Sequence, residues 1–78
     1  MTSIKVNLDS VDKVKEFVGI AGQVSEDLDL VHGKYVIDAK SLMGIFSLDL
    51  SKPLDLTINS DDEDRVEEIS AAFSSFRV

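Results

Sequence analysis

The chain contains no cysteine and no tryptophan, and it has only one proline and one histidine among its 78 residues. The absence of cysteine excludes a disulfide framework, a thiolate metal site and thiol redox chemistry. With His32 as the single histidine, few side chains could act as a general base near neutral pH. We therefore expect no catalytic residue, no cofactor and no enzymatic activity that this chain could support alone.

Basic residues are also scarce, since eight Lys and Arg stand against fifteen Asp and Glu and give a net charge of -7. Such a field repels nucleic acid and anionic membrane surfaces, so neither is an expected partner. No stretch approaches the length of a membrane span, and the first residues do not resemble a secretory signal. We expect one small cytoplasmic domain over residues 1–78, held together by packing alone.

The spacing of apolar residues changes period several times along the chain, as in a mixed domain. Alternating apolar residues predict strands, and apolar residues three or four apart predict helices. Strands are expected over residues 4–8, 24–31, 35–37 and 54–58, and helices over residues 11–21 and 41–50 and after residues 59–62. A turn at His32 and Gly33 would join the second and third strands.

The order of these elements is strand, helix, strand, strand, helix, strand, helix. Helices that follow strands in this way can all lie on one face of a single sheet. The Asp and Lys residues between the apolar strand positions would then cover the other face. The sequence predicts an α+β open-faced sandwich, with a four-stranded antiparallel sheet and three helices on one face.

Residues 39–49, with the sequence AKSLMGIFSLD, carry the most specific motif of the chain. This segment resembles the serine phosphorylation site of HPr, the histidine-containing phosphocarrier of the bacterial sugar phosphotransferase system. The similarity continues more loosely through residues 54–58, and the predicted order of elements is similar to the HPr order over nearly the whole chain. The resemblance implies an HPr-like fold, a role in sugar transport and carbon catabolite regulation, and phosphorylation at Ser41.

Ser41 is predicted to open the short helix, where its hydroxyl can cap a backbone N–H group. A phosphate added there would meet the N–H groups and the positive end of the helix dipole, beside Lys40. The alternative is that Ser41 serves only as an N-cap.

The short helix has more apolar residues than one buried face needs. An inner stripe points toward the sheet, while Met43 and Phe46 form a second stripe displaced around the helix. Either all of them belong to the core, or Met43 and Phe46, together with Leu42, form an exposed docking patch. The resemblance implies that an enzyme I-like component, an HPr serine kinase and a transcriptional regulator dock here, with Lys15 and Lys40 taking part.

The chain departs from HPr at the phosphoacceptor, which in that family is a histidine just ahead of the first helix. An ungapped alignment of residues 9–16 puts Lys13 at the histidine, Lys15 at the arginine and Glu16 at the proline that accompany it. A protonated lysine amine has no lone pair to donate near neutral pH. The sequence therefore predicts a regulatory or binding module that carries no phosphate on histidine.

Two other interpretations stay open. The chain could be an active phosphocarrier that uses His32 or another acceptor, or an HPr-fold scaffold or oligomerisation domain without phosphorylation. The acidic residues 61–64 lack the alternate spacing and central glycine of a calcium loop, so they predict a helix start and no metal site. The oligomeric state is left open.

Overall fold

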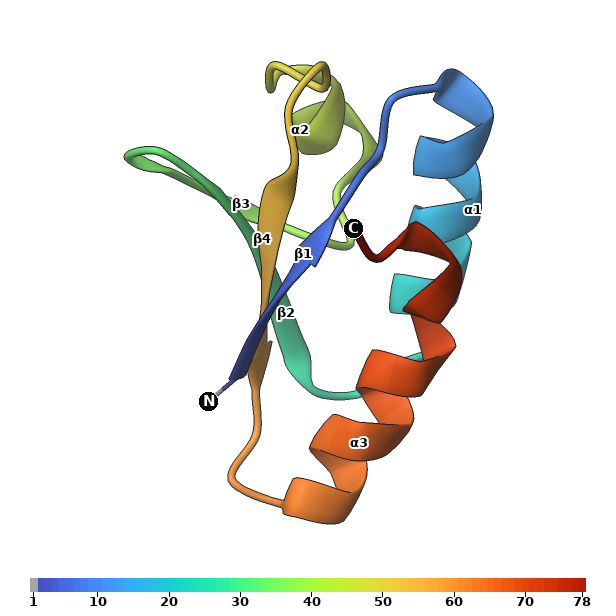
Figure 1. The fold of residues 1–78 in the computed structure, drawn as a ribbon, viewed down its shortest axis with the longest axis vertical. Helices are drawn as coiled ribbons and strands as arrows, with labels where there is room; N and C mark the ends of the chain where they lie inside the picture. The colour runs from blue at the N-terminus through green and yellow to red at the C-terminus, as the bar shows by residue number, and fades with distance from the viewer. Residues whose placement is uncertain (1) are drawn as a thin grey trace.

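The computed structural model describes residues 2–78 as one layer of strands covered by helices (Figure 1). The elements are β1 (Thr2–Val6), α1 (Val11–Ala21), β2 (Asp27–His32), β3 (Tyr35–Asp38), α2 (Leu42–Phe46), β4 (Leu54–Asn59), α3 (Glu63–Ala72) and a short 3-10 turn, η1 (Ser74–Phe76). The predicted order and the α+β class are confirmed. None of the described helices is long and apolar enough to cross a membrane.

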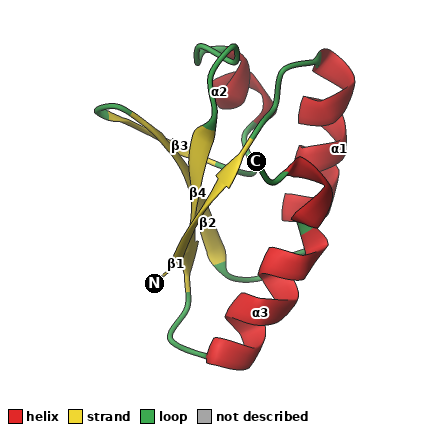
Figure 2. Cartoon of the chain, in the orientation of Figure 1, coloured by secondary structure: helices red, strands yellow, loops and turns green. Residues whose placement is uncertain are grey.

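The four strands form one antiparallel sheet in the order β1-β4-β2-β3. Figure 2 shows α1 and α3 side by side against one face of this sheet. The apolar strand positions point to that face, where they are buried, while the residues between them are polar or exposed. This arrangement is the predicted open-faced sandwich.

Aromatic rings fill the space between the helices. The ring of Phe17 in α1 lies 4.8 Å from that of Phe73 and 5.5 Å from that of Phe76. All three side chains are buried, and Ile45 of α2 belongs to the same core. At the end of α3, Phe73 points into this core, whereas its neighbour Ala72 is exposed.

Three elements have boundaries that differ from the sequence prediction by two residues or more. The helix expected over residues 41–50 covers only Leu42–Phe46, and turns lead from there to Pro53. The second strand begins at Asp27, not at residue 24, and the first strand is displaced toward the N-terminus. In each case the apolar residues outside the element are still buried or half-buried, as Leu8 and Leu48 are, because tertiary packing covers them without regular backbone.

The predicted hairpin turn is off by one residue. His32 is the last residue of β2 and pairs with Tyr35, so the two turn residues are Gly33 and Lys34. Gly33 has a φ of 59°, a value that a two-residue hairpin requires at its first position and that glycine adopts without strain. His32 is therefore a half-buried strand residue and not an exposed turn residue.

The two edge strands of the sheet, β1 and β3, differ in the segments that bond to them. At the β1 edge, Val6 forms a bridge with Arg77, and backbone hydrogen bonds join Asn7 to Phe76 and Val78 to Lys5. The C-terminal residues therefore cover β1. At the β3 edge, the part of the chain that the structure describes supplies no neighbouring strand, and the one backbone hydrogen bond there runs from the Ser41 N–H to the Asp38 carbonyl.

Candidate functional site

Ser41 is the N-cap of α2, as its sequence position predicts. Its backbone is extended, with φ -98° and ψ 104°, and its Oγ accepts a hydrogen bond from the backbone N–H of Gly44 at 3.1 Å. The backbone N–H of Ser41 donates to the carbonyl of Asp38, which ties the cap to the end of β3. The hydroxyl is thus fixed at the first turn of a short helix, and the residue is only half-buried.

Gly44 allows α2 to lie directly on β3. A Cβ atom at this position would be 2.7 Å from Cγ2 of Ile37 and 3.0 Å from Oγ of Ser41. A Cβ contact of 2.7 Å essentially never occurs in proteins, so only glycine fits here without a shift of its neighbours. The glycine of the motif therefore has a packing role that sequence reasoning did not assign to it.

Both the backbone and the side chain of Lys40 make hydrogen bonds that hold this residue in place. Its backbone N–H donates to Oδ1 of Asp38 at 2.9 Å, and its ammonium donates to the carbonyl oxygen of Val24 at 2.6 Å. The second bond joins the loop before α2 to the loop after α1. Lys40 therefore has a structural role in addition to its position beside Ser41.

The apolar residues of α2 divide into two sets. Ile45 is fully buried, and Leu42 is half-buried against the core. Met43 is 78% exposed and Phe46 is 38% exposed. Of the three residues expected in a docking patch, Met43 and Phe46 reach solvent, and we call this pair the α2 patch.

The start of α1 lies at the same end of the molecule as α2, and the two helices contact each other (Figure 1). The residue just ahead of α1 is Ser10, whose Oγ accepts a hydrogen bond from the backbone N–H of Lys13 at 3.1 Å. The ammonium of Lys13 donates to Asp9 at 2.9 Å, and this bond lowers the pKa of the Asp9 carboxyl. Lys13 is therefore inside the helix and paired, whereas Lys15 is exposed and has no ion pair among residues 2–78.

The place just ahead of the first helix is thus held by Ser10, three residues before the position that the ungapped alignment selects. A signal for this was present in the sequence, because the helical spacing begins at Val11 and makes Ser10 the natural N-cap.

His32 lies away from both helix starts. It lines a pocket with Tyr35 and with residues that follow α2, namely Ser47, Leu48 and Asp49. Hydrogen bonds from Ser51 lower the pKa of the Asp49 carboxyl, and the charges of Lys52 and His32 lower it further. The surroundings of His32 are therefore the C-terminal end of a helix and a carboxylate. Within the described chain, no group of three possible metal ligands occurs.

Comparison with known proteins identifies a family. A family model described as the PTS HPr component phosphorylation site matches residues 12–76. The comparison with curated proteins gives no match.

Two solved structures have the same fold. HPr-C-His from Thermoanaerobacter tengcongensis is 22% identical, with a TM-score of 0.74 over 96% of this chain and 93% of that chain. The phosphocarrier protein HPr from Bacillus anthracis str. Ames is 25% identical, with a TM-score of 0.65 over 92% of this chain and 93% of that chain. The family match covers most of the chain and includes α2 and its serine, and from this we conclude that the chain belongs to the HPr phosphocarrier family of the phosphotransferase system.

Proposed function

We propose that this chain is a regulatory or binding module of the phosphoenolpyruvate-dependent sugar phosphotransferase system, phosphorylated at Ser41 and unable to carry phosphate on histidine. The observation that carries the proposal is the position of the Ser41 hydroxyl at the first turn of α2, next to the exposed α2 patch.

The first turn of α2 has backbone N–H groups that could donate hydrogen bonds to a phosphate. Gly44 donates to Ser41 Oγ, but in the described residues the backbone N–H groups of Leu42 and Met43 have no acceptor. A phosphate on Ser41 brings three acceptor oxygens and a charge of roughly -1.5 to -2 to these donors and to the positive end of the helix. A phosphoserine at this cap is therefore compatible with the helix that it begins.

The α2 patch supports a docking role. Large apolar side chains exposed next to each other on one helix are typical of surfaces that bind other proteins. Methionine is flexible enough to fit partners of different shape. We propose that an enzyme I-like component, an HPr serine kinase and a transcriptional regulator bind here, with Lys15 at the neighbouring helix start.

Histidine phosphorylation has little support. Ser10 holds the place ahead of α1, and a serine hydroxyl is a weak nucleophile without an adjacent base. His32 faces Asp49 and the residues that follow α2, where the helix end carries negative partial charge. Both groups repel a phosphoryl group, so His32 is a poor acceptor.

Intact mass spectrometry after two separate incubations tests the proposal. The protein is incubated with ATP and an HPr serine kinase, and separately with phosphoenolpyruvate and enzyme I. The first incubation should add one phosphate that survives acid, is lost in Ser41→Ala and is retained in the matched cap variant Ser10→Ala. The second incubation should add no mass.

Each other result points to a different function. An acid-labile phosphate from enzyme I that disappears in His32→Gln would establish an active carrier and overturn the proposal. If neither incubation adds mass, an HPr-fold scaffold without phosphorylation is the better description.

A further inference from the structure

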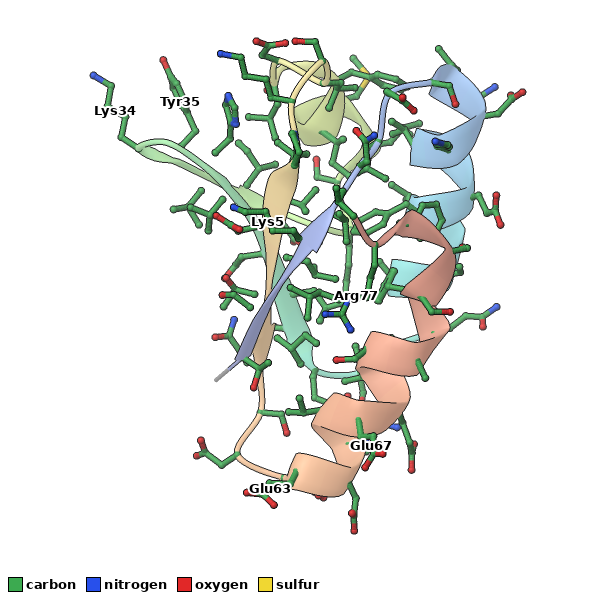
Figure 3. All side chains as sticks on the ribbon, in the orientation of Figure 1. Lys5, Lys34, Tyr35, Glu63, Glu67 and Arg77 are labelled. Atoms are coloured by element: carbon green, nitrogen blue, oxygen red, sulfur yellow. The ribbon has the colours of Figure 1, made fainter. Side chains whose placement is uncertain are left out.

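Among residues 2–78, no strand pairs with the outer edge of β3. The β2–β3 hairpin projects away from the body of the molecule, and Figure 3 shows Lys34 and Tyr35 at its tip, pointing into solvent. Tyr35 is 59% exposed and Val36 is 63% exposed. An exposed edge strand with apolar side chains is a template for pairing with another strand.

Hydrogen bonding within the hairpin determines which backbone groups face outward. His32 and Tyr35 flank the two-residue turn, and Ala39 donates to the carbonyl of Leu28 further along the same strand pair. The odd-numbered residues of β3 therefore bond to β2, and by alternation Val36 and Asp38 direct their N–H and C=O groups to the open edge. The Asp38 carbonyl accepts from Ser41 on that side, whereas Val36 has no backbone partner in the described chain.

We propose that β3 pairs antiparallel with β3 of a second copy of this chain, around a two-fold axis at Val36. Val36 then lies opposite Val36 of the second copy, and each Lys34 lies opposite the other Asp38. A two-fold axis produces every contact twice, so one complementary pair of residues is enough to stabilise both ends of the strand pair.

The charges of Lys34 and Asp38 favour this register and favour a second copy of the chain as the partner. Lys34 is exposed and makes no ion pair among the residues that the structure describes. Asp38 lies directly opposite Asp29 of β2, a like-charge pair that is unfavourable in a sheet. Lys34 of the second copy would lie on the other side of Asp38 and neutralise this repulsion.

The apolar residues of the open face agree with the same register. Val36 pairs with Val31 of β2, and both point to the open face of the sheet. In the proposed dimer these two valines and their symmetry mates form one continuous row across the axis. Because only alternate residues of β3 direct their backbone groups to the open edge, the nearest alternative registers are shifted by two residues, and they place Val36 opposite Asp38 or Lys34 of the second copy. Only the Val36-centred register therefore pairs valine with valine and lysine with aspartate.

The interface is small. A strand of four residues cannot bury the roughly 1,200 Å² of a standard stable interface, so we expect weak association that is best detected by trapping it. Because the chain lacks cysteine, a single introduced cysteine can form a disulfide between protein chains only with the same residue of a second copy, which makes the dimer detectable. Residues opposite each other at a hydrogen-bonded site have Cα atoms about 5.5 Å apart, within the range that a disulfide spans.

The experiment compares disulfide dimer formation by Val36→Cys and Val11→Cys in a glutathione buffer, with thermal unfolding by circular dichroism as the folding control. Val11 is an exposed valine on α1 and reports random collision. We expect Val36→Cys to form disulfide dimers faster than Val11→Cys. Adding Lys34→Asp should slow the Val36→Cys reaction roughly tenfold, because two opposite-charge pairs become like-charge pairs. Adding Asp38→Lys as well should restore the rate.

The proposal fails if Val36→Cys reacts no faster than Val11→Cys, or if the charge changes have no effect on its rate. A folded Val36→Cys protein that stays monomeric would mean that the edge is left for a different occupant, such as an extended peptide, and would also overturn the proposal. Neither result bears on phosphorylation at Ser41, which the mass measurements test separately.

Discussion

Gly44 of α2 lies against Ile37 of β3 with no room for a side chain between them, because a Cβ atom on Gly44 would be 2.7 Å from Cγ2 of Ile37. The contact fixes the height of α2 above the sheet. It also fixes the Ser41 hydroxyl, since the backbone N–H of Gly44 is the group that Ser41 caps. One glycine thus positions both α2 and the proposed phosphorylation site.

Gly44→Ala should therefore destabilise the protein. Alanine gains up to about 1 kcal/mol over glycine in a helix, but forcing a methyl group into a packed contact costs about 1–3 kcal/mol. We expect a net loss of about 1 kcal/mol in the free energy of urea unfolding. Gly19→Ala is the matched control, because a Cβ atom on Gly19 meets nothing within 4 Å, and it should stabilise α1 by about 0.5–1 kcal/mol. Equal effects at the two glycines would refute the packing argument.

Ser41→Ala removes the N-cap of α2 and should cost about 1 kcal/mol of unfolding free energy. Ser41→Asp should stay within a few tenths of a kcal/mol of the original protein, since aspartate caps well and its charge suits the helix N-terminus. Thermal and urea unfolding of the three proteins provide the measurement. If Ser41→Asp is as unstable as Ser41→Ala, the side chain does not act as a cap.

Glu26 and Arg65 form a bidentate ion pair that should make the free energy of unfolding depend on pH. Arg65 donates from Nε and from a terminal nitrogen to the two carboxylate oxygens of Glu26, both at 2.7 Å. These hydrogen bonds lower the pKa of Glu26 from 4.5 to about 2. A carboxyl whose pKa is lower in the folded state stabilises the fold above its unfolded pKa and loses that effect as pH falls through the folded pKa.

Glu26→Gln measures how much the ionised Glu26–Arg65 pair contributes to the free energy of unfolding. At neutral pH the variant should be less stable than the original protein, and the difference should shrink as the pH falls from about 5 toward 2, where Glu26 becomes protonated and neutral like glutamine. Urea unfolding at a series of pH values gives the comparison. A difference that does not change with pH would mean that the ionised pair contributes nothing to stability.

Alanine substitutions at Phe17 and Phe46 compare the loss of a buried ring with the loss of a partly exposed one. Phe17→Ala removes a fully buried ring from the aromatic cluster, and such changes cost about 3–5 kcal/mol. That is a large part of the total stability of a domain this small, about 4–12 kcal/mol, so the variant should be largely unfolded at 37 °C.

Phe46→Ala should cost about 1 kcal/mol or less, since its side chain is partly exposed, and the protein should stay folded. If the α2 patch docks partners, the same change should reduce the initial rate of Ser41 phosphorylation by the serine kinase. A Phe46→Ala protein that is folded and phosphorylated at the original rate would exclude Phe46 from the docking surface.

The parts of the fold that depend on neighbours in sequence were predictable. Val11–Ala21 is a helix with the predicted bounds because a cap, an apolar stripe and a following glycine all act within a few residues of each other. The role of Ser41 as N-cap follows from the same local chemistry. The hairpin prediction was wrong by one residue because both possible turns contain Gly33, and only the pairing of His32 with Tyr35 shows that Gly33 is the first of the two turn residues and not the second.

The sequence by itself determined the order of the elements, the alternation that gives the sheet one apolar face, and the serine that begins α2. Only the tertiary structure decided what covers each surface: Ile37 against Gly44, the Val24 carbonyl on Lys40, and the C-terminal residues along β1 but not along β3. The physical reason is distance along the chain. Periodicity and caps reflect interactions within one turn or one strand, whereas exposure depends on segments many residues away that pack together when the whole chain folds.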